Sequence, residues 1–356
     1  MAAVHSYLRR VARIGAAALA SVAIGLCAIP SAARAADKVS VGLLRFVSGG
    51  PVFLAFERGY FKDAGLDVDL KFFEAAQPIA VAVVSGDVAY GATAFTGGFF
   101  NLAGKGALKI IAAQSKEQKG FEGNAILVSN AAWDKGFQKL SDFPGHSLGI
   151  TQVGSSFHYQ IGQLARVAGF DLKSVNLKPL QSLPNMAAAL KGNQVDAIII
   201  APNIAKPLVA AGTGHLIGWY SDYDEYQFGG LFTATSTVQN KRELTLRFVR
   251  AYQRGSADYA AAFMQRDASG KRNFDAASED AAKIIAKYVY PGDPLEKSVP
   301  LVEASAFPAD PQARLDVGDI YTQIAWLKSQ GLVDASVDPK TTLDLSFVEG
   351  HYNIPK

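Results

Sequence analysis

A glycine followed by two serines forms the segment best suited to bind a charged ligand. It lies in residues 151–156, which read TQVGSS, between a predicted strand at 147–151 and a predicted helix at about 155–168. N–H groups at the start of a helix have no acceptor within it, and the helix dipole favours negative charge there. With its hydroxyl groups, the segment is typical of an anion-binding site. The alternative is that Ser155 only caps its helix, although one serine can do both. Its candidate ligand-binding residues are Gln152, Gly154, Ser155, Ser156 and Phe157.

Three other loops follow predicted strands and should lie near this segment. In open parallel sheets, the loops at the carboxyl ends of the strands line the ligand crevice. Aromatic side chains just past a strand end, with few polar anchors, suit a small organic ligand. An arginine there would be either a bidentate clamp for carboxylate or sulfonate or a solvated loop residue. The candidates in these loops are Arg45, Phe46, Ser48, Gly49, Phe95, Thr96 and Asn203.

Signals of catalysis are missing from the sequence. The glycines around Lys105 lack the spacing and the Ser or Thr of a phosphate-binding loop. The histidines after the first 35 residues are scattered along the chain, and no pattern assembles a nucleophile, a base and an orienting acid. We therefore expect a protein that is not an enzyme, with no catalytic residues, no metal and no cofactor.

Alternating strands and helices indicate an α/β protein with two lobes. One series of predicted strands lies at 39–44, 68–73, 88–93 and 109–113. A second lies at 125–128, 147–151, 175–179, 195–201 and 216–220, and the first of these could leave the first sheet. Repeated units of this kind predict mostly parallel sheets covered by helices.

The C-terminal part predicts three helices, at 241–266, 276–288 and 317–329. In the first, Phe248, Tyr252, Tyr259 and Phe263 form one amphipathic stripe. We expect this tail to pack back on the first sheet. The predicted lobes are then 36–125 plus 232–356, and 126–231, connected by crossings near 122–129 and 226–236 that act as a hinge.

The first 35 residues predict a cleavable export signal. Three arginines within 9–13 precede an uncharged run at 14–33, and the small-x-small pattern at 33–35 predicts cleavage after Ala35. A permanent membrane anchor is the alternative, since about 20 uncharged residues can span a bilayer. The run is rich in Ala and Gly and contains Pro30, which favours cleavage and a periplasmic product. The general and twin-arginine export routes both stay open.

Charge and cysteine content exclude several classes of function. The whole chain has 35 Lys and Arg against 32 Asp and Glu, a net charge of +3. The predicted leader holds four arginines and no acid, so the rest has 31 basic and 32 acidic residues, a net charge of −1. A near-neutral protein lacks the basic face that nucleic acids require. The only cysteine, Cys27, lies in the leader, which excludes thiol catalysis and disulfides from the mature chain.

Three segments resemble the periplasmic substrate-binding proteins of nitrate, sulfonate and taurine ABC importers, an NMT1-like family. The first is 59–68, GYFKDAGLDV, with a Gly-Asp turn at 86–87. The second is 148–159, which contains LGI and GSSFHY, and the third is 186–196, MAAALKGNQVD, followed by Pro202. The order and spacing of these segments extend the similarity over essentially the whole mature chain.

This resemblance implies a periplasmic-binding-protein-like fold of type II, with two mixed-sheet α/β lobes joined by a two-crossing hinge. It implies lobes that close on a small solute and deliver it to an ABC permease with a cytoplasmic ATPase. The family's pocket positions match the loop after the first strand, the loop at Phe95 and Thr96, and the Gly-Ser-Ser segment.

The ligand does not follow from the resemblance. Relatives take up sulfonates, nitrate, pyrimidine precursors or aromatic acids, and the first loop, 45–51, departs from the family pattern. That loop favours a small organic anion, a sulfonate or carboxylate, with an aromatic body as one option. We expect a monomer with no nucleic-acid partner; an enzyme of the same fold acting on a small heterocycle or carboxylate is the alternative.

Overall fold

The computed structural model describes residues 35–355 of the chain. From Asp37 onward these residues form one compact unit. The predicted leader lies outside the described residues except for Ala35, its last residue, so its cleavage stays a prediction. Within the described part, no helix has the length and apolar character needed to cross a membrane.

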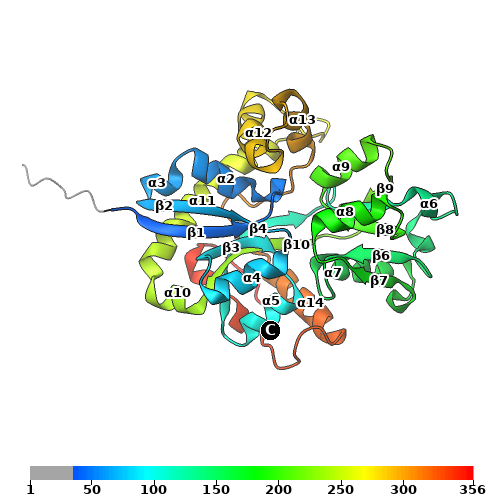
Figure 1. The fold of residues 1–356 in the computed structure, drawn as a ribbon. Coiled ribbons are helices and arrows are strands. Elements are labelled where there is room, and N and C mark those ends of the chain that lie inside the picture. The colour runs from blue at the N-terminus through cyan, green and yellow to red at the C-terminus, as the bar shows by residue number, and fades with distance from the viewer. Residues whose placement is uncertain (1–34, 356) are drawn as a thin grey trace, which may run out of the picture. The chain divides into compact units, whose positions relative to one another are not determined.

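Two five-stranded sheets organise the described residues into two lobes (Figure 1). The strands of the first lobe are β1 (Asp37–Leu43), β2 (Leu66–Phe72), β3 (Tyr90–Ala94), β4 (Leu108–Glu117) and β10 (Tyr226–Ala234). Those of the second lobe are β5 (Ala125–Val128), β6 (Ser147–Ile150), β7 (Asn176–Pro179), β8 (Ala197–Ile200) and β9 (His215–Trp219). The strand orders are β2-β1-β3-β10-β4 and β7-β6-β8-β5-β9.

Each sheet is mixed because one strand in it runs against the others. β1 is parallel to β2 and β3, whereas β10 is antiparallel to β3 and β4. In the second sheet β6 is parallel to β7 and β8, whereas β5 is antiparallel to β8 and β9. β5 and β10 are the strands that directly follow a crossing between the lobes: the crossings are residues 118–124 and 220–225, whereas the sequence predicted 122–129 and 226–236. They start at the edge where the parallel strands end, so they run in the opposite direction. The strand at 125–128 therefore belongs to the second sheet rather than to the exit of the first.

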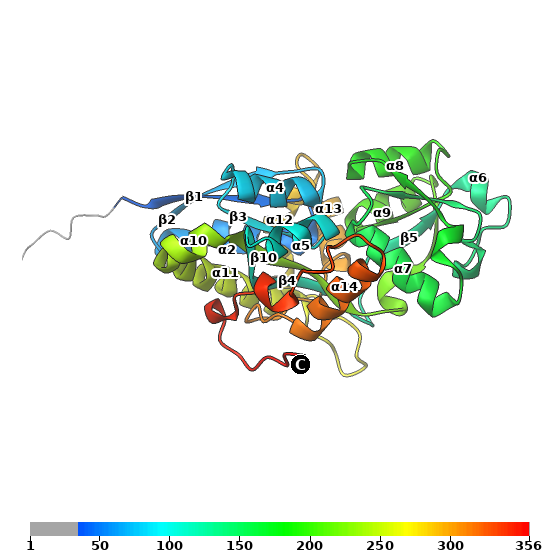
Figure 2. The same cartoon turned by 90° about the horizontal axis from the view of Figure 1, so that it is seen from below.

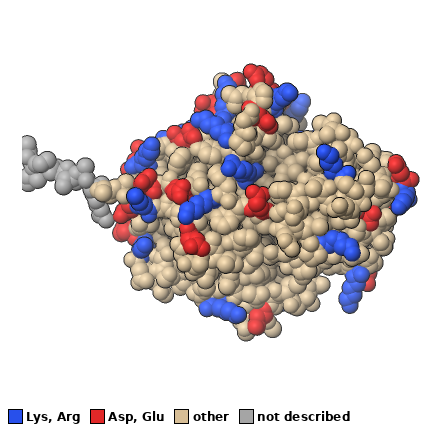
Figure 3. Space-filling model, viewed as in Figure 1, with Lys and Arg blue, Asp and Glu red and all other residues tan. Residues whose placement is uncertain are grey.

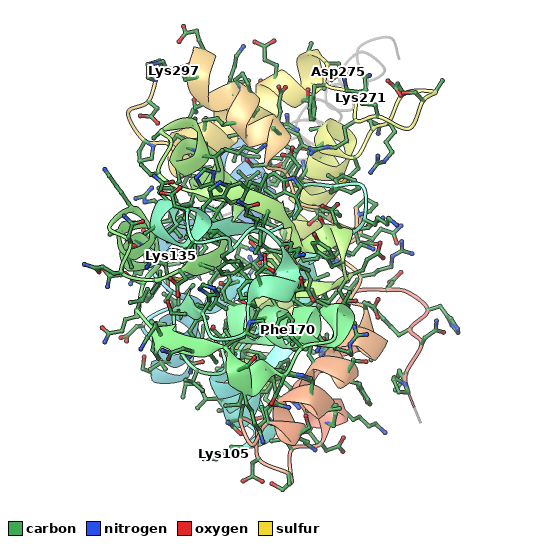
Figure 4. The ribbon with its side chains drawn as sticks, turned by 90° about the vertical axis from the view of Figure 1, so that its right-hand side faces the viewer. Lys105, Lys135, Phe170, Lys271, Asp275 and Lys297 are labelled. Atoms are coloured by element: carbon green, nitrogen blue, oxygen red, sulfur yellow. The ribbon has the colours of Figure 1, made fainter. Side chains whose placement is uncertain are left out.

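Helices cover both faces of each sheet (Figures 1 and 2). Those of the first lobe are α2 (Gly50–Glu57), α3 (Tyr60–Asp63), α4 (Ala76–Ser85), α5 (Gly97–Gly104), α10 (Thr235–Asn240), α11 (Arg242–Phe263), α12 (Ala276–Val289), α13 (Leu295–Ala304) and α14 (Val317–Ser329). Those of the second lobe are α6 (Asn130–Trp133), α7 (Ser156–Ala168), α8 (Leu183–Lys191) and α9 (Pro202–Ala210). In Figure 4 the second lobe, which carries Phe170, faces the viewer, and the first lobe extends past it at both ends, where Lys297 and Lys105 are labelled.

The C-terminal helices pack on the first lobe, in agreement with the amphipathic stripe. All four aromatic residues of the stripe in α11 are buried. Phe248 stacks on Tyr90 of β3, with the ring centroids 4.0 Å apart. α10 and α13 were not predicted; α13 contains Pro300, which lacks an N–H and makes the segment look like a loop in sequence. The predicted residue limits of the two lobes stay a prediction.

Candidate functional site

An enclosed pocket, here called the inner pocket, lies where the loops behind the strands of the two lobes meet. The first lobe lines it with Leu44, Phe46, Ala75, Ala76, Ala94, Thr96 and Phe228. The second lobe lines it with Thr151, Ser155, Ser156, Phe157 and Leu183. The space open to the centre of a water molecule is about 20 Å³, which is room for about one water. The structure therefore represents a closed arrangement of the lobes.

The start of α7 forms one side of the inner pocket. Gly154 has a φ of 80°, a left-handed conformation that glycine adopts without strain and that turns the chain into the helix. Ser155 is the N-cap, and its Oγ accepts a hydrogen bond from the N–H of His158 at 3.4 Å. The N–H groups of Ser156 and Phe157, in the first turn, have no acceptor within the helix. They are placed to bind a negatively charged group.

A buried histidine holds the glycine turn in place. Nδ1 of His158 accepts a hydrogen bond of 3.0 Å from the N–H of Gly154. Burial lowers the pKa of His158, so its imidazole is neutral and able to accept. The ring also meets Trp326 of α14 edge to face, at 5.7 Å between centroids. His158 therefore supports the pocket from behind, rather than facing it as a general base.

The start of α5 lies opposite that of α7. Thr96 caps α5, accepting a hydrogen bond of 3.0 Å from the N–H of Phe99, and its hydroxyl also bonds to the side chain of Gln77. The N–H of Gly97 donates to the carbonyl oxygen of Gly154 at 2.8 Å. The starts of two helices from different lobes thus face each other, and both present their positive dipole ends to the inner pocket.

Aromatic rings form the apolar wall. Phe46, Phe157 and Phe228 line the inner pocket from three different elements. Phe95 was predicted to join them, but it packs against Phe99 and Phe100, at centroid distances of 5.3 and 5.6 Å. It therefore supports the wall from the core of the first lobe.

A second space, here called the outer pocket, adjoins the inner one. Its lining residues are Arg45, Phe46, Phe73, Glu74, Leu183, Pro184, Asn203, Ile204, Val289 and Tyr290. Its volume, measured as the space that the centre of a water molecule can occupy, is about 300 Å³. Phe46 and Leu183 line both spaces and separate them, so the outer pocket is the approach to the inner pocket.

Arg45 and Asn203 belong to the outer pocket. Nη1 of Arg45 donates to the carbonyl oxygen of Tyr288 at 2.9 Å, and its guanidinium lies 4.0 Å from the ring centroid of Phe72. Asn203 bridges the lobes: its Nδ2 donates to the carbonyl oxygen of Arg45 at 3.4 Å, and its own carbonyl oxygen accepts from the hydroxyl of Tyr290 at 2.9 Å. In this closed arrangement the guanidinium faces away from the inner pocket.

The predicted site residues fall into four groups. Those that line the inner pocket are Phe46, Thr96, Ser155, Ser156 and Phe157. Those in the outer pocket are Arg45 and Asn203, while Gly154 and Phe95 support the inner pocket from behind. Ser48 and Gly49 are buried in a 3₁₀ turn at 47–49 beside the pockets, and Gln152 accepts the N–H of Ser155 through its backbone.

Several lining residues were not predicted. Thr151 directly follows β6 in the predicted ligand-binding segment but was not named as a candidate, and Leu183 begins α8. Phe228 lies in β10, and no local pattern distinguishes it from the other buried aromatic residues of that strand. Its place at the pocket follows from the position of β10 between β3 and β4 in the sheet.

The inner pocket contains no charged side chain: all the residues that line it are apolar or carry a hydroxyl group. Negative charge on a ligand would be stabilised by N–H dipoles and hydroxyl groups alone. On the face shown in Figure 3, acidic and basic side chains are interspersed and separated by uncharged surface. In the described part of the chain, no three His, Cys, Asp or Glu residues gather in a way that could hold a metal ion.

Comparison with protein families gives one match. The model of the family described as "NMT1/THI5 like" matches residues 48–263. That range includes both crossings and every lining residue of the inner pocket except Leu44 and Phe46. Comparison with curated proteins gives no match.

Solved structures share the fold at low sequence identity. The alkanesulfonate-binding protein SsuA from Xanthomonas axonopodis pv. citri, bound to MOPS, is 16% identical with a TM-score of 0.67, over 87% of this chain and 98% of that one. The periplasmic nitrate-binding protein NrtA from Synechocystis PCC 6803 is 13% identical with a TM-score of 0.67, over 86% and 84%. A mutant of DszB in complex with biphenyl-2-sulfinic acid is 14% identical with a TM-score of 0.57, over 87% and 97%. These likenesses confirm the predicted two-lobed fold of type II.

Proposed function

The chain belongs to the NMT1/THI5-like family, and from this premise we propose that it is the solute-binding component of an ABC importer. In this proposal the lobes close on a small organic anion and the protein delivers it to the permease. The observation that carries the proposal is the inner pocket, where two helix starts from different lobes face each other beside an apolar wall.

We propose a sulfonate or carboxylate as the ligand, with an aromatic body as the favoured option. The hydroxyl groups of Ser155 and Ser156 and the free N–H groups of the first turn of α7 would bind the anionic end. The rings of Phe46, Phe157 and Phe228 would contact the body of the ligand. The bound MOPS and biphenyl-2-sulfinic acid in two structures of the same fold support this class of ligand.

The uncharged lining favours a ligand with a single negative charge. Neutral dipoles stabilise one charge in a buried site, whereas a second charge without a cation would carry a large desolvation cost. The nearest cationic side chain of the two pockets, Arg45, is engaged with Tyr288 and Phe72 in the outer pocket.

An enzyme of the same fold is the alternative. The inner pocket does hold hydroxyl groups, but the neighbouring His158 uses Nδ1 to accept the N–H of Gly154. The Nδ1 atom of His158 is therefore not free to act as a base for Ser155 or Ser156. We propose that the bound solute is released unchanged.

The setting of this function is also proposed. The leader would direct export and be removed after Ala35, and the mature chain would act in the periplasm as a monomer. Its partners would be an ABC permease and the cytoplasmic ATPase.

A thermal-shift titration of residues 36–356 tests the proposal. The probes are methanesulfonate, benzenesulfonate, acetate, benzoate and nitrate, and we expect the two aromatic anions to raise the Tm most. A ligand at 100 times its Kd adds about 2.7 kcal/mol to the free energy of unfolding. Recovery of the probe in altered form would favour the enzyme instead.

Serine substitutions locate the anion. Ser155→Ala and Ser156→Ala should each weaken binding of the best probe by about tenfold or more, because each removes a hydrogen bond to a charged group. Ser336→Ala is the control, since its hydroxyl bonds only to Asp334, away from both pockets. Wild-type affinity in both Ser155→Ala and Ser156→Ala would show that the anion binds elsewhere.

A further inference from the structure

A carboxyl group is buried where the chain first leaves the first lobe. Glu117 is the last residue of β4 and has no solvent exposure. Its Oε1 accepts hydrogen bonds from the backbone N–H of Asn124 at 3.0 Å and from Nε2 of Gln160 at 3.1 Å. Its Oε2 has no hydrogen-bond partner among the described residues.

The two crossings enclose this carboxyl group. The N–H of Gly123 donates to Oγ of Ser221 at 3.1 Å, and Oγ of Ser221 donates to the carbonyl oxygen of Phe121 at 2.6 Å. The N–H of Tyr220 donates to the carbonyl oxygen of Asn124 at 2.7 Å. Oε2 of Glu117 lies so close to Gly123 that a Cβ added there would be 1.7 Å from it. A side chain at residue 123 would therefore have to displace the carboxyl group, and the backbone of Gly123 occupies a place where water would otherwise solvate Oε2.

Further polar atoms around Glu117 are buried without a partner in the described part of the chain. They are Nδ2 and Oδ1 of Asn124, Oε1 of Gln160 and the hydroxyl of Tyr226. An unpaired polar atom in a protein interior costs free energy, and an unpaired negative charge costs much more. A proton on Glu117 removes the charge and supplies a donor to the acceptors among these atoms, which are Oδ1 of Asn124, Oε1 of Gln160 and the hydroxyl oxygen of Tyr226.

The groups that face Glu117 offer no positive charge. Tyr226 of β10 and Tyr220 of the second crossing lie near it, Tyr159 of α7 packs on Tyr226, and the carboxyls of Asp319 and Asp224 lie beyond them. The basic group of this cluster, Arg166, is exposed and forms an ion pair of 3.1 Å with Asp224 at the surface. Burial accordingly raises the pKa of Glu117 to about 8, against the smaller opposing effect of its two hydrogen bonds.

The surroundings of the carboxyl group also depend on the position of the second lobe. Gln160 lies in α7, one turn after the first-turn residues Ser156 and Phe157 of the inner pocket. Its hydrogen bond to Glu117 joins the ligand-binding helix to the end of β4 in the first lobe. Rotation of α7 away from the first lobe would remove Gln160 and admit water to the carboxyl group.

We infer that Glu117 is a proton-binding site of the hinge, protonated when the lobes are closed and releasing its proton when they separate. The ligand-binding consequence rests on the proposed function, whereas the proton site itself does not. Its occupant is a proton, taken up from water as the lobes close and returned to water as they open.

The sign of the pH effect follows from the difference in the pKa of Glu117 between the closed and the open lobes. A carboxyl whose pKa is raised in the closed form favours closure fully below its ordinary pKa of 4.5, and that advantage is lost as the pH rises to about 8. Between about pH 6 and pH 8, the ratio of closed to open molecules should fall by about fifty-fold for a carboxyl that is hydrated in the open form. Above about pH 9 the ratio should be constant.

Small-angle X-ray scattering of ligand-free residues 36–356 between about pH 5.5 and pH 9 tests the inference. The wild type should expand as the pH rises, whereas Glu117→Gln, which imitates the protonated carboxyl, should lose the part of this expansion that occurs between about pH 6 and pH 8. Glu225→Gln is the matched control, because Glu225 is an exposed carboxylate of the second crossing that accepts the N–H of Lys119 at 2.8 Å. The control should behave as the wild type. An expansion between about pH 6 and pH 8 that persists unchanged in Glu117→Gln would overturn the inference.

Infrared spectroscopy separates a failure of the proton site from a failure of the proposed function. At about pH 6, the wild type should show a carbonyl stretching band of a protonated carboxyl that Glu117→Gln lacks and Glu225→Gln retains. Absence of that band in the wild type would exclude the proton site, whatever the protein binds. Its presence alongside failure of every anion in the thermal-shift panel would leave the proton site in place and remove the proposed ligand class.

Discussion

The N–H of Gly97 donates a hydrogen bond of 2.8 Å to the carbonyl oxygen of Gly154, and this bond joins the first turn of α5 to the turn before α7. The two glycines come from different lobes, so the bond exists only when the lobes are closed. A Cβ on Gly97 would lie 3.0 Å from the carbonyl oxygen of Leu332, and Gly154 has a left-handed φ. The backbone contact thus depends on the absence of a side chain at both positions.

Gly154→Ala should weaken binding of the best anionic probe. Alanine at a φ of 80° carries a strain of about 1 kcal/mol, which relaxation of the turn would relieve at the expense of the bond to Gly97. Gly169→Ala is the matched control, because Gly169 ends the same helix with a φ of 76° and open space around it. Both variants should lose similar stability in urea unfolding. Equal affinity of the two variants would contradict a role for the turn in binding.

Gly162→Ala should disturb the contact between α7 and α14. A Cβ at Gly162 would lie 2.1 Å from Cζ2 of Trp326, so the helices must separate or the ring must turn. Such overpacking costs about 1–3 kcal/mol, and we expect a lower Tm with a red-shifted Trp fluorescence as the ring gains contact with water. Gly318→Ala in α14, where the nearest atom would be 3.7 Å away, should leave both unchanged. An unshifted spectrum in Gly162→Ala would argue against the packing described.

Tyr290→Phe should loosen the outer pocket. The variant removes the hydrogen bond of 2.9 Å from the Tyr290 hydroxyl to the carbonyl oxygen of Asn203, which connects the lobes. A neutral hydrogen bond contributes about 0.5–1.5 kcal/mol, so the probe should bind about two- to tenfold more weakly, mainly through faster dissociation in stopped-flow measurements. Tyr288→Phe is the comparison, since that hydroxyl bonds to Glu57 within the first lobe. Similar dissociation rates in the two variants would mean that the hydrogen bond between Tyr290 and Asn203 does not hold the lobes together.

Asp319→Asn should flatten part of the dependence of stability on pH. Burial raises the pKa of Asp319 to about 7, although Gln227 and Gln323 donate hydrogen bonds to it. Its contribution to stability is therefore complete below the ordinary pKa of 3.8 and is lost as the pH rises through about 7. Urea unfolding at several pH values should show this fall in the wild type and in Asp134→Asn, an exposed control. If the stability of Asp319→Asn fell by the same amount as the pH rises, the pH dependence would come from another group.

The alternating pattern of the chain was sufficient to predict most of the strands. Apolar runs such as that of β8 (Ala197–Ile200) can be buried on both sides only within a covered sheet, and each is followed by a helix signal. The direction of β5 and β10 could not be read in this way, because a strand has the same side-chain pattern whichever way it runs beside its neighbour. α13 was hidden by Pro300, which is tolerated there by packing that the local sequence does not show.

The candidate site was predicted in part for a related reason. The Gly-Ser-Ser segment and Thr96 could be recognised because helix capping is local, and both lie in the inner pocket or beside it. Phe228 was missed because its role depends on the position of β10 in the sheet. Arg45 was predicted as either a clamp or a solvated loop residue, and the contacts of its guanidinium are made by Tyr288 and Phe72, which lie far away along the chain.

The sequence by itself determined the two-lobed α/β class, the family and the helix start with its hydroxyl groups, because these follow from periodicity, order and local capping. Only the tertiary structure decided which side chains line the inner pocket and how Glu117 is enclosed. Burial, and with it the charge state of a carboxyl group, depends on residues from several segments that meet only after folding.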